Sequence, residues 1–438
     1  MSTTTAAPET ATPRARESLK KIVFWNYGGL FFFYFASWQL VFTFLPLWLK
    51  HEGMTPGPIG VVGTVQAVTA LLLQPLYGVL QDRLGFRKNL FYFVVICGAL
   101  MGPFFMFVFM PLIGVNQVLA AVVGGVFLSL CLNSGVGVVE AFNERNARAN
   151  NFEYGHIRLF GSIAGGTMSL VGGFIWAANP DSIWWAGSFS AVVLGTLLFL
   201  ARTPKPGEPG ARAAGVDGDQ GSRPRVTRES VRALVTSRSF VGFCVLMFGT
   251  AAIYDVFDAQ FPNYFVEMIG GNADVLFTRV VSVQIFAEAA FMVVAPFIVN
   301  KIGARNGLLV FAVVLVVRVL GSAFITGPEM LVVWRLLAAI EMPFMLVSVM
   351  KYITRMFDVR ISATAYMLGF NMSKQIGVAL FSTVFGYSYE AIGFAHSYVV
   401  MAVVVAVVTT AAVVLMRDDR ALGVEDSGVP EARAAHEV

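Results

Sequence analysis

About twelve apolar runs, each long enough to cross a lipid bilayer as a helix, recur along this chain of 438 residues. A spanning helix needs about 20 predominantly apolar residues, whereas the strands of a membrane barrel alternate apolar and polar residues. Only 13% of the residues are charged, about half the share that is usual in a soluble domain. The runs therefore predict an all-α membrane protein with twelve transmembrane helices.

One long polar insert interrupts this pattern between the sixth and seventh runs. It is rich in Gly, Pro and Arg, a composition typical of a flexible linker. The predicted organisation is an N-terminal tail over residues 1–22, a six-helix half over 23–201, a linker over 202–238, a second six-helix half over 239–416 and a C-terminal tail over 417–438.

Basic residues indicate the orientation of the chain in the membrane. They gather in alternate loops, for example from Arg83 to Lys88 and from Lys301 to Arg305. Short loops rich in Lys and Arg stay in the cytoplasm. We therefore expect a multi-pass protein of the inner (plasma) membrane, with both termini and the linker in the cytoplasm. Lys50, at the end of the first run, is a mild exception to the pattern.

The loop after the second run combines turn glycines with a cluster of charges. Its distinctive residues are Gly78, Asp82, Arg83, Gly85, Arg87 and Lys88. A weaker echo, from Pro296 to Asn306, follows the eighth run. This loop resembles the signature loop of the major facilitator superfamily. The resemblance implies the fold of that superfamily, in which two six-helix halves hold a substrate between them.

Nine ionisable residues lie within the apolar runs or at their ends, away from the basic loops; they are Glu140, Arg158, Asp255, Asp258, Glu288, Arg318, Arg335, Glu341 and Lys374. A charge inside the membrane costs about 2.5–3.5 kcal/mol unless it is paired, protonated or hydrated. Asp255 and Asp258 are three residues apart, so both lie on one face of a helix. We expect Lys374 and Arg335 to be their partners. The alternative is that such pairs only hold helices together.

Glu140 ends the fourth run and Arg158 opens the fifth, with a short polar loop between them. A carboxylate and a guanidinium that face a cavity can bind neighbouring hydroxyls of a sugar through charge-assisted hydrogen bonds. The alternative is that both charges simply lie at the level of the lipid headgroups.

Two acids and one base then remain, namely Glu288, Glu341 and Arg318. If the other pairs form, one of these acids lacks a full partner. Such an acid can hold a proton while it is occluded and release it when Arg318 approaches or water enters. That is the physical requirement for proton coupling. A purely structural acid–base cluster is the alternative.

Several of these residues stand in motifs that resemble those of the oligosaccharide:proton symporters, a family of the major facilitator superfamily. The motifs are Tyr254-Asp255-Val-Phe-Asp258, Val139-Glu140-Ala-Phe, Asn151-Phe-Glu-Tyr-Gly155 with Arg158, Arg318-Val-Leu-Gly-Ser-Ala-Phe, Met350-Lys351-Tyr-Ile-Thr and Ser373-Lys374-Gln375. The resemblance extends from about Phe24 to Ala411. It implies proton-coupled import of a disaccharide or small oligosaccharide by alternating access.

The resemblance also implies roles for single residues. The implied sugar-binding residues are Glu140, Arg158, Asn133 and Glu288, the implied proton-coupling residues are Glu341, Arg318 and Glu288, and the implied interhelical charge pairs are Asp255 with Lys374 and Asp258 with Arg335.

The chain departs from the lactose-transporting members of that family at three positions. Ala338 and Gly165 stand where those members have a histidine and a tryptophan, and Glu288 lies one turn after Ile285, which occupies their glutamate site. Around Glu288 the sequence is more similar to the sucrose permease branch. We therefore favour a sucrose-like substrate, with a galactoside or another sugar as the alternative. Trp38 is a candidate for the missing stacking face, with core packing as the alternative.

Other function classes fit the sequence less well. An exporter of amphipathic drugs would favour a less charged cavity, and a membrane sugar sensor usually carries a sizeable soluble extension. The sequence contains no metal-binding spacing and no paired nucleophile and base, so we expect no enzyme activity, no metal and no cofactor. The net charge of +4 does not suggest nucleic acid. The expected partners are a sugar, a proton and the lipid bilayer, and we expect a functional monomer.

Overall fold

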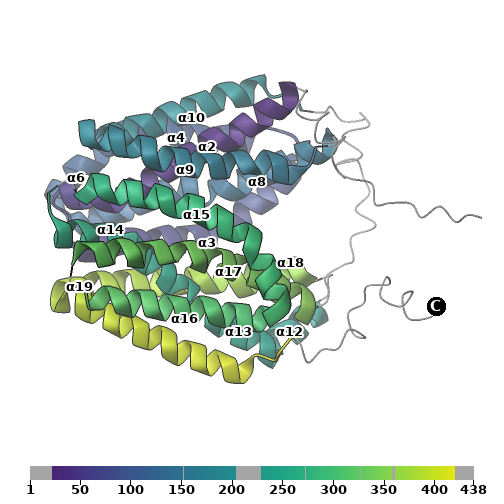
Figure 1. Ribbon diagram of the computed structural model, residues 1–438. Helices are drawn as coiled ribbons and strands as arrows, with labels where there is room; N and C mark the ends of the chain where they lie inside the picture. The colour runs from purple at the N-terminus through teal and green to yellow at the C-terminus, as the bar shows by residue number, and fades with distance from the viewer. Residues whose placement is uncertain are drawn as a thin grey trace, which may run out of the picture.

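The computed structural model describes residues 22–150, 152–203, 228–271, 273–325, 327–357 and 361–419. The predicted N-terminal tail up to residue 21, most of the predicted linker and the end of the C-terminal tail lie outside these residues. Within the described part every regular element is helical, and the membrane-length helices run roughly along one common axis (Figure 1).

The first half contains six spans, some of which consist of more than one helix. They are α2 (Ile22–His51); α3 (Pro56–Leu84); α4 (Asn89–Ala99) with α5 (Met101–Phe104), η1 (Phe105–Phe109) and α6 (Met110–Val115); α7 (Gln117–Leu128) with η2 (Ser129–Asn133) and α8 (Gly135–Ala149); α9 (Tyr154–Ala178); and α10 (Ser182–Leu200). The third span bends by 47° after Ala99. Pro103 follows the bend, and a proline cannot donate the backbone hydrogen bond that would continue the helix.

The second half begins with the short helix α12 (Arg228–Thr236). This helix lies inside the predicted linker, so the end of that segment is helical rather than irregular. The spans that follow are α13 (Arg238–Gly249) with α14 (Ala251–Ile269); α15 (Ala273–Ile302); α16 (Ala304–Ala323); α17 (Pro328–Met356); and α18 (Ser362–Ala365) with η4 (Tyr366–Met372) and α19 (Ser373–Leu415).

A single glycine divides α19 into two spans. Its 43 residues would form a straight helix of about 65 Å, more than twice the thickness of the hydrocarbon core. Gly393 has φ 78° and ψ 168°, a left-handed conformation that favours glycine. The chain reverses there, because Tyr389 Oη lies 3.7 Å from Met401 Sδ and Ser388 Oγ lies 2.7 Å from Ser397 Oγ.

The expected twelve spans are therefore present. Ten helices of the described chain are long and apolar enough to cross a membrane, or eleven when the bent third span counts as one. The division of α19 at Gly393 gives the twelfth. The predicted fold class, an all-α membrane protein with twelve helices in two halves, is confirmed.

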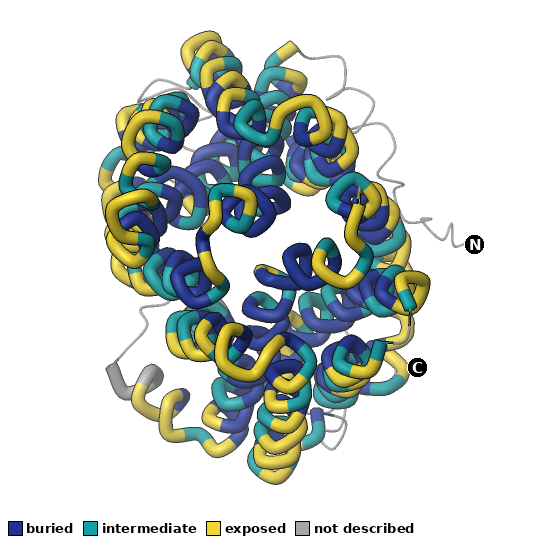
Figure 2. The backbone as a smooth tube through the Cα atoms, turned by 90° about the vertical axis from the view of Figure 1, so that its left-hand side faces the viewer, coloured by how far each residue is buried: buried dark blue, intermediate teal, exposed yellow. Residues whose placement is uncertain are grey.

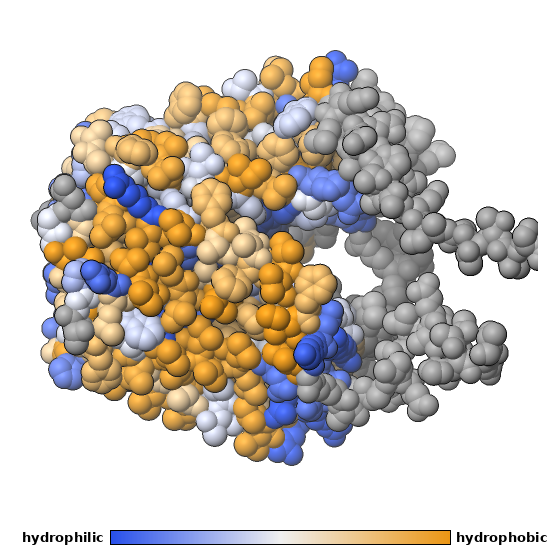
Figure 3. Space-filling model, viewed as in Figure 1, coloured by the Kyte–Doolittle hydropathy of each residue, from blue (hydrophilic) through white to orange (hydrophobic). Residues whose placement is uncertain are grey.

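The outer circumference of the bundle is apolar, as a lipid-facing surface requires. Leu72, Phe107 and Phe297 have exposed fractions of 71%, 72% and 73%, and apolar side chains cover much of the flank in Figure 3. Buried segments lie toward the interior when the bundle is viewed along its axis (Figure 2). The polar groups discussed below therefore lie inside the bundle.

The described ends of both halves lie at one end of the bundle (Figure 1). Near the start of α2, Tyr27 Oη donates to the carbonyl of Arg202, 2.6 Å away, just after α10. At the start of α13, Arg238 Nη2 donates to the carbonyl of Val414, 3.2 Å away, at the end of α19. Each half therefore begins and ends on the same side, as an even number of spans requires.

The predicted signature loop lies at this same end. Gly85 turns the chain with φ 58°, and Lys88 Nζ donates to the carbonyl of Ala201, 2.6 Å away. Arg83 and Arg87 are exposed. Gly78 is exposed on α3, and a Cβ added there would meet no described atom within 4 Å, so this glycine does not mark a helix contact. Asp82 lies in α3, but its side chain is outside the described part.

Asp419 ties the end of the second half to the start of α16 and the end of α17. Its carboxylate accepts the backbone N–H of Ala304 at 2.8 Å, that of Arg305 at 3.0 Å and Nη1 of Arg355 at 2.8 Å. These donors hold the pKa of Asp419 below its usual value, although burial acts in the opposite direction. Asp419 therefore stabilises the folded state in its ionised form.

Replacing Asp419→Asn is expected to lower the free energy of unfolding by about 1–2 kcal/mol, because one charged acceptor serves three donors. The depressed pKa makes this contribution present above about pH 4, the ordinary pKa of aspartate, and lost as the pH falls below it. Thermal unfolding in detergent at pH 7 and at low pH measures both effects. Glu153→Gln, at an exposed residue, is the control, and equal losses in both variants would contradict the expectation.

The two halves meet at the end of the bundle away from the termini. There Lys50 Nζ lies 3.1 Å from Glu267 Oε2, Trp176 Nε1 donates to Asp274 Oδ2 at 2.5 Å, and the N–H of Gly57 donates to Glu390 Oε1 at 2.8 Å; each donor belongs to the first half and each carboxylate to the second. At the opposite end the surface is hollowed between the halves (Figure 3). The bundle is thus closed at one end and open at the other.

Candidate functional site

Four charges from three helices form one connected cluster inside the second half. Arg318 of α16 donates from Nε to Glu341 Oε1 at 2.8 Å, and its Nη2 lies 2.7 Å from Glu341 Oε2. Its Nη1 donates to Asp258 Oδ1 at 2.8 Å. Asp258 Oδ2 accepts from Arg335 Nη1 at 2.7 Å. Two acids and two bases therefore balance one another across α14, α16 and α17.

This cluster is shielded from solvent. The side chains of Arg318 and Glu341 are fully buried, and the guanidinium carbon of Arg318 lies 5.3 Å from the ring centre of Tyr254 and 4.8 Å from that of Phe257. Aromatic faces attract a cation without neutralising it. The predicted pair of Asp258 with Arg335 forms. Sequence reasoning missed that Arg318 also reaches Asp258 and joins this pair to Glu341.

The other predicted pair, Asp255 with Lys374, is more accessible. Lys374 Nζ lies 2.9 Å from Asp255 Oδ2, and the two side chains retain exposed fractions of 21% and 32%. This pair joins α14 to α19, and it shares no described atom with the Arg318 cluster. Water inside the bundle can therefore reach it.

Removal of either member of the Asp255–Lys374 pair is expected to impair transport more than removal of both. A single change strands one charge in the bundle, at a cost of about 1–3 kcal/mol for a partly hydrated pair. Uptake by vesicles that contain Asp255→Asn, Lys374→Met or the double variant, normalised to the amount of protein in the membrane, tests this. Losses that multiply in the double variant would argue against a direct pairing.

Glu140 and Arg158 meet on the inner face of the first half. Arg158 Nε donates to Glu140 Oε1 at 3.2 Å, and the side chains of Arg158 and Glu140 are 36% and 38% exposed, respectively. The guanidinium of Arg158 lies 4.4 Å from the ring centre of Phe35 and 5.7 Å from that of Phe31. An accessible ion pair beside aromatic rings offers both hydrogen bonds and an apolar face, which is the chemistry that a sugar needs.

Asn133 lies seven residues before Glu140 in the same span, at the end of η2. Its carbonyl accepts from Gln74 Nε2 at 3.4 Å, and its side chain is half-buried. No hydrogen bond between described residues connects its side chain to the Glu140–Arg158 pair. The structure therefore places Asn133 in the same span as the pair without joining it to them.

Glu288 of α15 has no ion pair within the described part of the chain. Gln284, one turn earlier on the helix, is its hydrogen-bonding neighbour. Arg335 is the cation whose charge acts on the Glu288 carboxylate. Gln284 is buried, and its Oε1 has no hydrogen-bond partner among the described residues. The sequence left Glu288 and Glu341 without an assigned pair. In the structure Glu341 forms an ion pair with Arg318, whereas Glu288 forms none within the described residues.

Ala338 and Gly165, which replace a histidine and a tryptophan of the lactose-transporting members, place small residues in α17 and α9. Ala338 is fully buried in α17 between Arg335 and Glu341, three residues from each. Gly165 lies on α9, and a Cβ added there would meet a single described atom within 4 Å, Gln39 Oε1 at 3.6 Å. Small side chains therefore border both the charge cluster and the inner face of α9.

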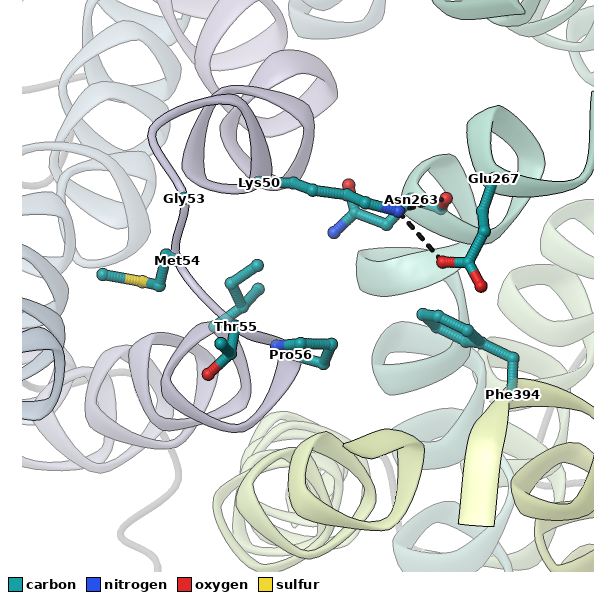
Figure 4. A pocket seen from close by; sticks show the side chains of 9 residues that line it. Lys50, Gly53, Met54, Thr55, Pro56, Asn263, Glu267 and Phe394 are labelled. Carbon is teal, nitrogen blue, oxygen red and sulfur yellow. Dashed lines mark hydrogen bonds and ion pairs between the residues drawn. The ribbon is translucent and has the colours of Figure 1, made fainter. Parts of the chain in front are cut away.

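A pocket of about 260 Å³ lies at the closed end, between the two halves. Its lining includes Lys50, Asn263, Glu267 and Phe394, from α2, α14 and α19, and Figure 4 shows the Lys50 ammonium between Glu267 and the carbonyl of Asn263. The sequence marked Lys50 only as an exception in its loop. The basic charge at this end has a specific carboxylate partner in the other half.

The sequence profile described as LacY proton/sugar symporter matches residues 16–428. The chain belongs to this family. The predicted membership of the oligosaccharide:proton symporters is therefore confirmed, and the chain is a multi-pass membrane sugar:proton symporter rather than an enzyme.

Individual relatives support the same assignment. The chain is 35% identical over 423 residues to a raffinose permease of Escherichia coli, a match that covers 95% of this chain and 97% of the relative. It is 30% identical over 406 residues to a sucrose permease of the same organism, at 92% and 95% coverage. The structure of the nucleoside transporter NupG covers 90% of this chain and 99% of its own, with a TM-score of 0.76 at 14% identity, and so supports the fold alone.

Membership in the LacY family does not identify which sugar this chain transports. The relatives include permeases named for raffinose, lactose and sucrose, at 30–35% identity. The sucrose permease is not the most similar of them, so the sucrose preference that we drew from the sequence stays a proposal.

Proposed function

We propose that this LacY family member imports a disaccharide or small oligosaccharide together with a proton, by alternating access, and that it functions as a monomer in the inner membrane. Both termini are taken to be cytoplasmic, as the basic loops indicate. The hollow between the halves then opens to the cytoplasm, and the contacts of Lys50, Trp176 and Gly57 close the outer side. This arrangement corresponds to an inward-open state of the carrier.

Glu140 and Arg158 are proposed to hold the sugar, with Asn133 as a further contact. The support is that the pair is exposed to the interior of the bundle and lies over Phe35. A carboxylate accepts and a guanidinium donates, so adjacent hydroxyls of one ring can satisfy both groups.

Proton coupling is proposed to run through Glu341, Arg318 and Glu288. The observation that carries it is the charge balance of the second half. Asp255, Asp258 and Glu341 each have a cationic partner, whereas Glu288 has no ion pair among the described residues. Protonation of Glu341 would free Arg318 to neutralise Asp258 alone. If Glu288 is neutral, the charges of Asp258, Glu341, Arg318 and Arg335 cancel. Proton uptake at Glu288 or at Glu341 would therefore change the charge balance of the second half.

A sucrose-like substrate is the first choice, and galactosides are the alternative. The support is the sequence around Glu288, which is more similar to the sucrose permease branch than to the lactose-transporting members, together with Gly165 and Ala338, which stand where those members carry a tryptophan and a histidine. Raffinose contains a sucrose unit, so the similarity to a raffinose permease is compatible with this choice.

Uptake of sucrose, raffinose, lactose and melibiose into sealed vesicles, with the external pH recorded, tests the proposal. We expect sucrose to enter and the medium to become more alkaline as protons enter with it. Uptake without a change in external pH would overturn the proton coupling. Uptake of lactose and melibiose but not sucrose would replace the sucrose preference with the galactoside alternative.

A further inference from the structure

The side-chain amide of Gln284 lies one turn before Glu288 on the same face of α15. Gln284 is 4% exposed, and its Oε1 is buried without a hydrogen-bond partner in the described part of the chain. Native proteins keep few buried polar atoms of this kind, because an acceptor that is removed from water and left unpaired destabilises the fold. The free oxygen of Gln284 therefore points to a partner that is present in another state of the carrier.

Glu288 lies between the interior of the bundle and the buried charge cluster. It is half-buried, whereas Glu341 is fully buried. Arg335 is the cation that acts on Glu288, but Nη1 of Arg335 is already bound to Asp258 Oδ2 at 2.7 Å. Glu288 is therefore a carboxyl group that water can reach and that no cation fully neutralises, and such a group can exchange a proton with the water inside the bundle.

The other charged and titratable groups near Glu288 come from the helices packed against α15. Arg335 of α17 attracts its charge, Asp258 of α14 repels it, and Tyr254 of α14 also interacts with it. The charge of Arg318 in α16 is taken up by ion pairs with Glu341 and Asp258. In α9 the described titratable residues lie in the first two turns; they are Tyr154, His156 and Arg158. To this set Gln284 adds a neutral group that can both donate and accept hydrogen bonds.

A glutamine can serve a carboxyl group in either protonation state. Its amino group donates to an ionised carboxylate, and its oxygen accepts from the O–H of a protonated acid. The terminal torsion of glutamine is broad and roughly two-fold, so a half-turn of the amide exchanges the two groups. In the structure the amide of Gln284 acts as a donor to Glu288, and Oε1 stays free for the protonated state.

We propose that Gln284 is a positioning residue for proton coupling, whose amide turns over when Glu288 gains or loses a proton. The inference rests on the proposed role of Glu288 in coupling. When a proton binds to Glu288, the new O–H donates to Gln284 Oε1. When that O–H bond breaks, the proton passes to water in the bundle, the electron pair stays on the carboxylate, and Gln284 Nε2 donates to it. Glu288 thus keeps a hydrogen bond in both states, and neither state becomes a trap.

Gln284→Met tests this role, because methionine keeps most of the volume and removes both the donor and the acceptor. Sugar efflux from vesicles, which requires release of the proton, is measured across a range of pH beside counterflow, which does not require it. The variant loses more for the ionised state than for the neutral one, since hydrogen bonds to charged groups are the stronger. We expect the midpoint of the efflux profile to rise by about one pH unit and counterflow to be unchanged.

A double variant separates a role through Glu288 from a purely structural one. In Glu288→Gln the acid that exchanges the proton is absent, so the addition of Gln284→Met should change neither efflux nor its pH profile any further. Gln66→Met is the matched control. Gln66 is another buried glutamine with an amide atom that lacks a partner among the described residues, and it lies on α3 in the other half. This control should leave the efflux midpoint unchanged.

The outcomes separate this inference from the function on which it rests. If the unmodified carrier moves no sugar, or moves no protons with it, the proposed function fails and the role of Gln284 fails with it. If coupling is intact and Gln284→Met leaves the midpoint in place, or slows efflux and counterflow equally, the role of Gln284 alone is overturned. An effect of Gln284→Met that persists in the Glu288→Gln background also overturns it, whereas a shift that depends on Glu288 supports it.

Discussion

Vesicles that contain Glu341→Gln are expected to lose sugar accumulation against a gradient while they still exchange labelled for unlabelled sugar. Glutamine matches glutamate in shape but cannot take up or release a proton. In the structure Glu341 is fully buried and contacts Arg318 through both of its oxygens. The glutamine of the variant keeps the side chain at this position permanently neutral. Arg318 retains Asp258 as its partner, which preserves the cluster.

The accumulation ratio of this variant should fall to about one, since sugar then equilibrates passively. Counterflow in the same vesicles should remain within a few-fold of the unmodified carrier. Glu329→Gln, in the exposed first turn of the same helix, controls for the change from carboxylate to amide. Normal uphill uptake by Glu341→Gln would transfer the proton-carrying role to Glu288, for which Glu288→Gln is the corresponding experiment.

Replacing Arg158→Ala should abolish measurable sugar binding. The change removes the charged donor of the proposed site, and it leaves Glu140 without its only described ion-pair partner. Hydrogen bonds to charged groups contribute about 1.5–3 kcal/mol each. The loss of two such bonds predicts an affinity at least about 100-fold weaker.

Isothermal titration of the purified carrier in detergent measures this effect directly. Arg158→Lys is expected to recover only part of the affinity, because an ammonium cannot form the fork of parallel hydrogen bonds that a guanidinium offers. Arg279→Ala, at an exposed arginine of α15, should bind sugar normally. If Arg158→Ala binds sugar as well as the unmodified protein does, the sugar site lies elsewhere in the bundle.

The fold could be predicted from the sequence because its main determinants are local. The lengths of the apolar runs, the basic loops and the polar insert can each be recognised within segments of about 20–40 residues. Together they predict twelve spans in two halves. Two local features were missed. The helix α12 lies inside a segment whose composition suggested only irregular chain, and Gly393 separates two spans by one residue with a left-handed conformation rather than by a polar loop.

The site could be predicted only where the spacing of charges constrained it. Asp255 and Asp258 share a helical face, so each required a cation from another helix, and both expected pairs form. The contact of Arg318 with Asp258 could not be deduced, because one guanidinium can serve two carboxylates and the sequence does not reveal how α14 and α16 rotate toward each other.

The contacts that Lys50, Trp176 and Gly57 make at the closed end have a mechanical consequence. When two rigid bodies tilt about an axis near the bilayer centre, the displacement of each atom grows with its distance from that axis. Contacts at the periphery separate after a tilt of a few degrees, whereas groups near the pivot hardly move. If the carrier works by the proposed alternating access, side chains on this rim are expected to set how much time it spends facing each side, although they do not contact the sugar.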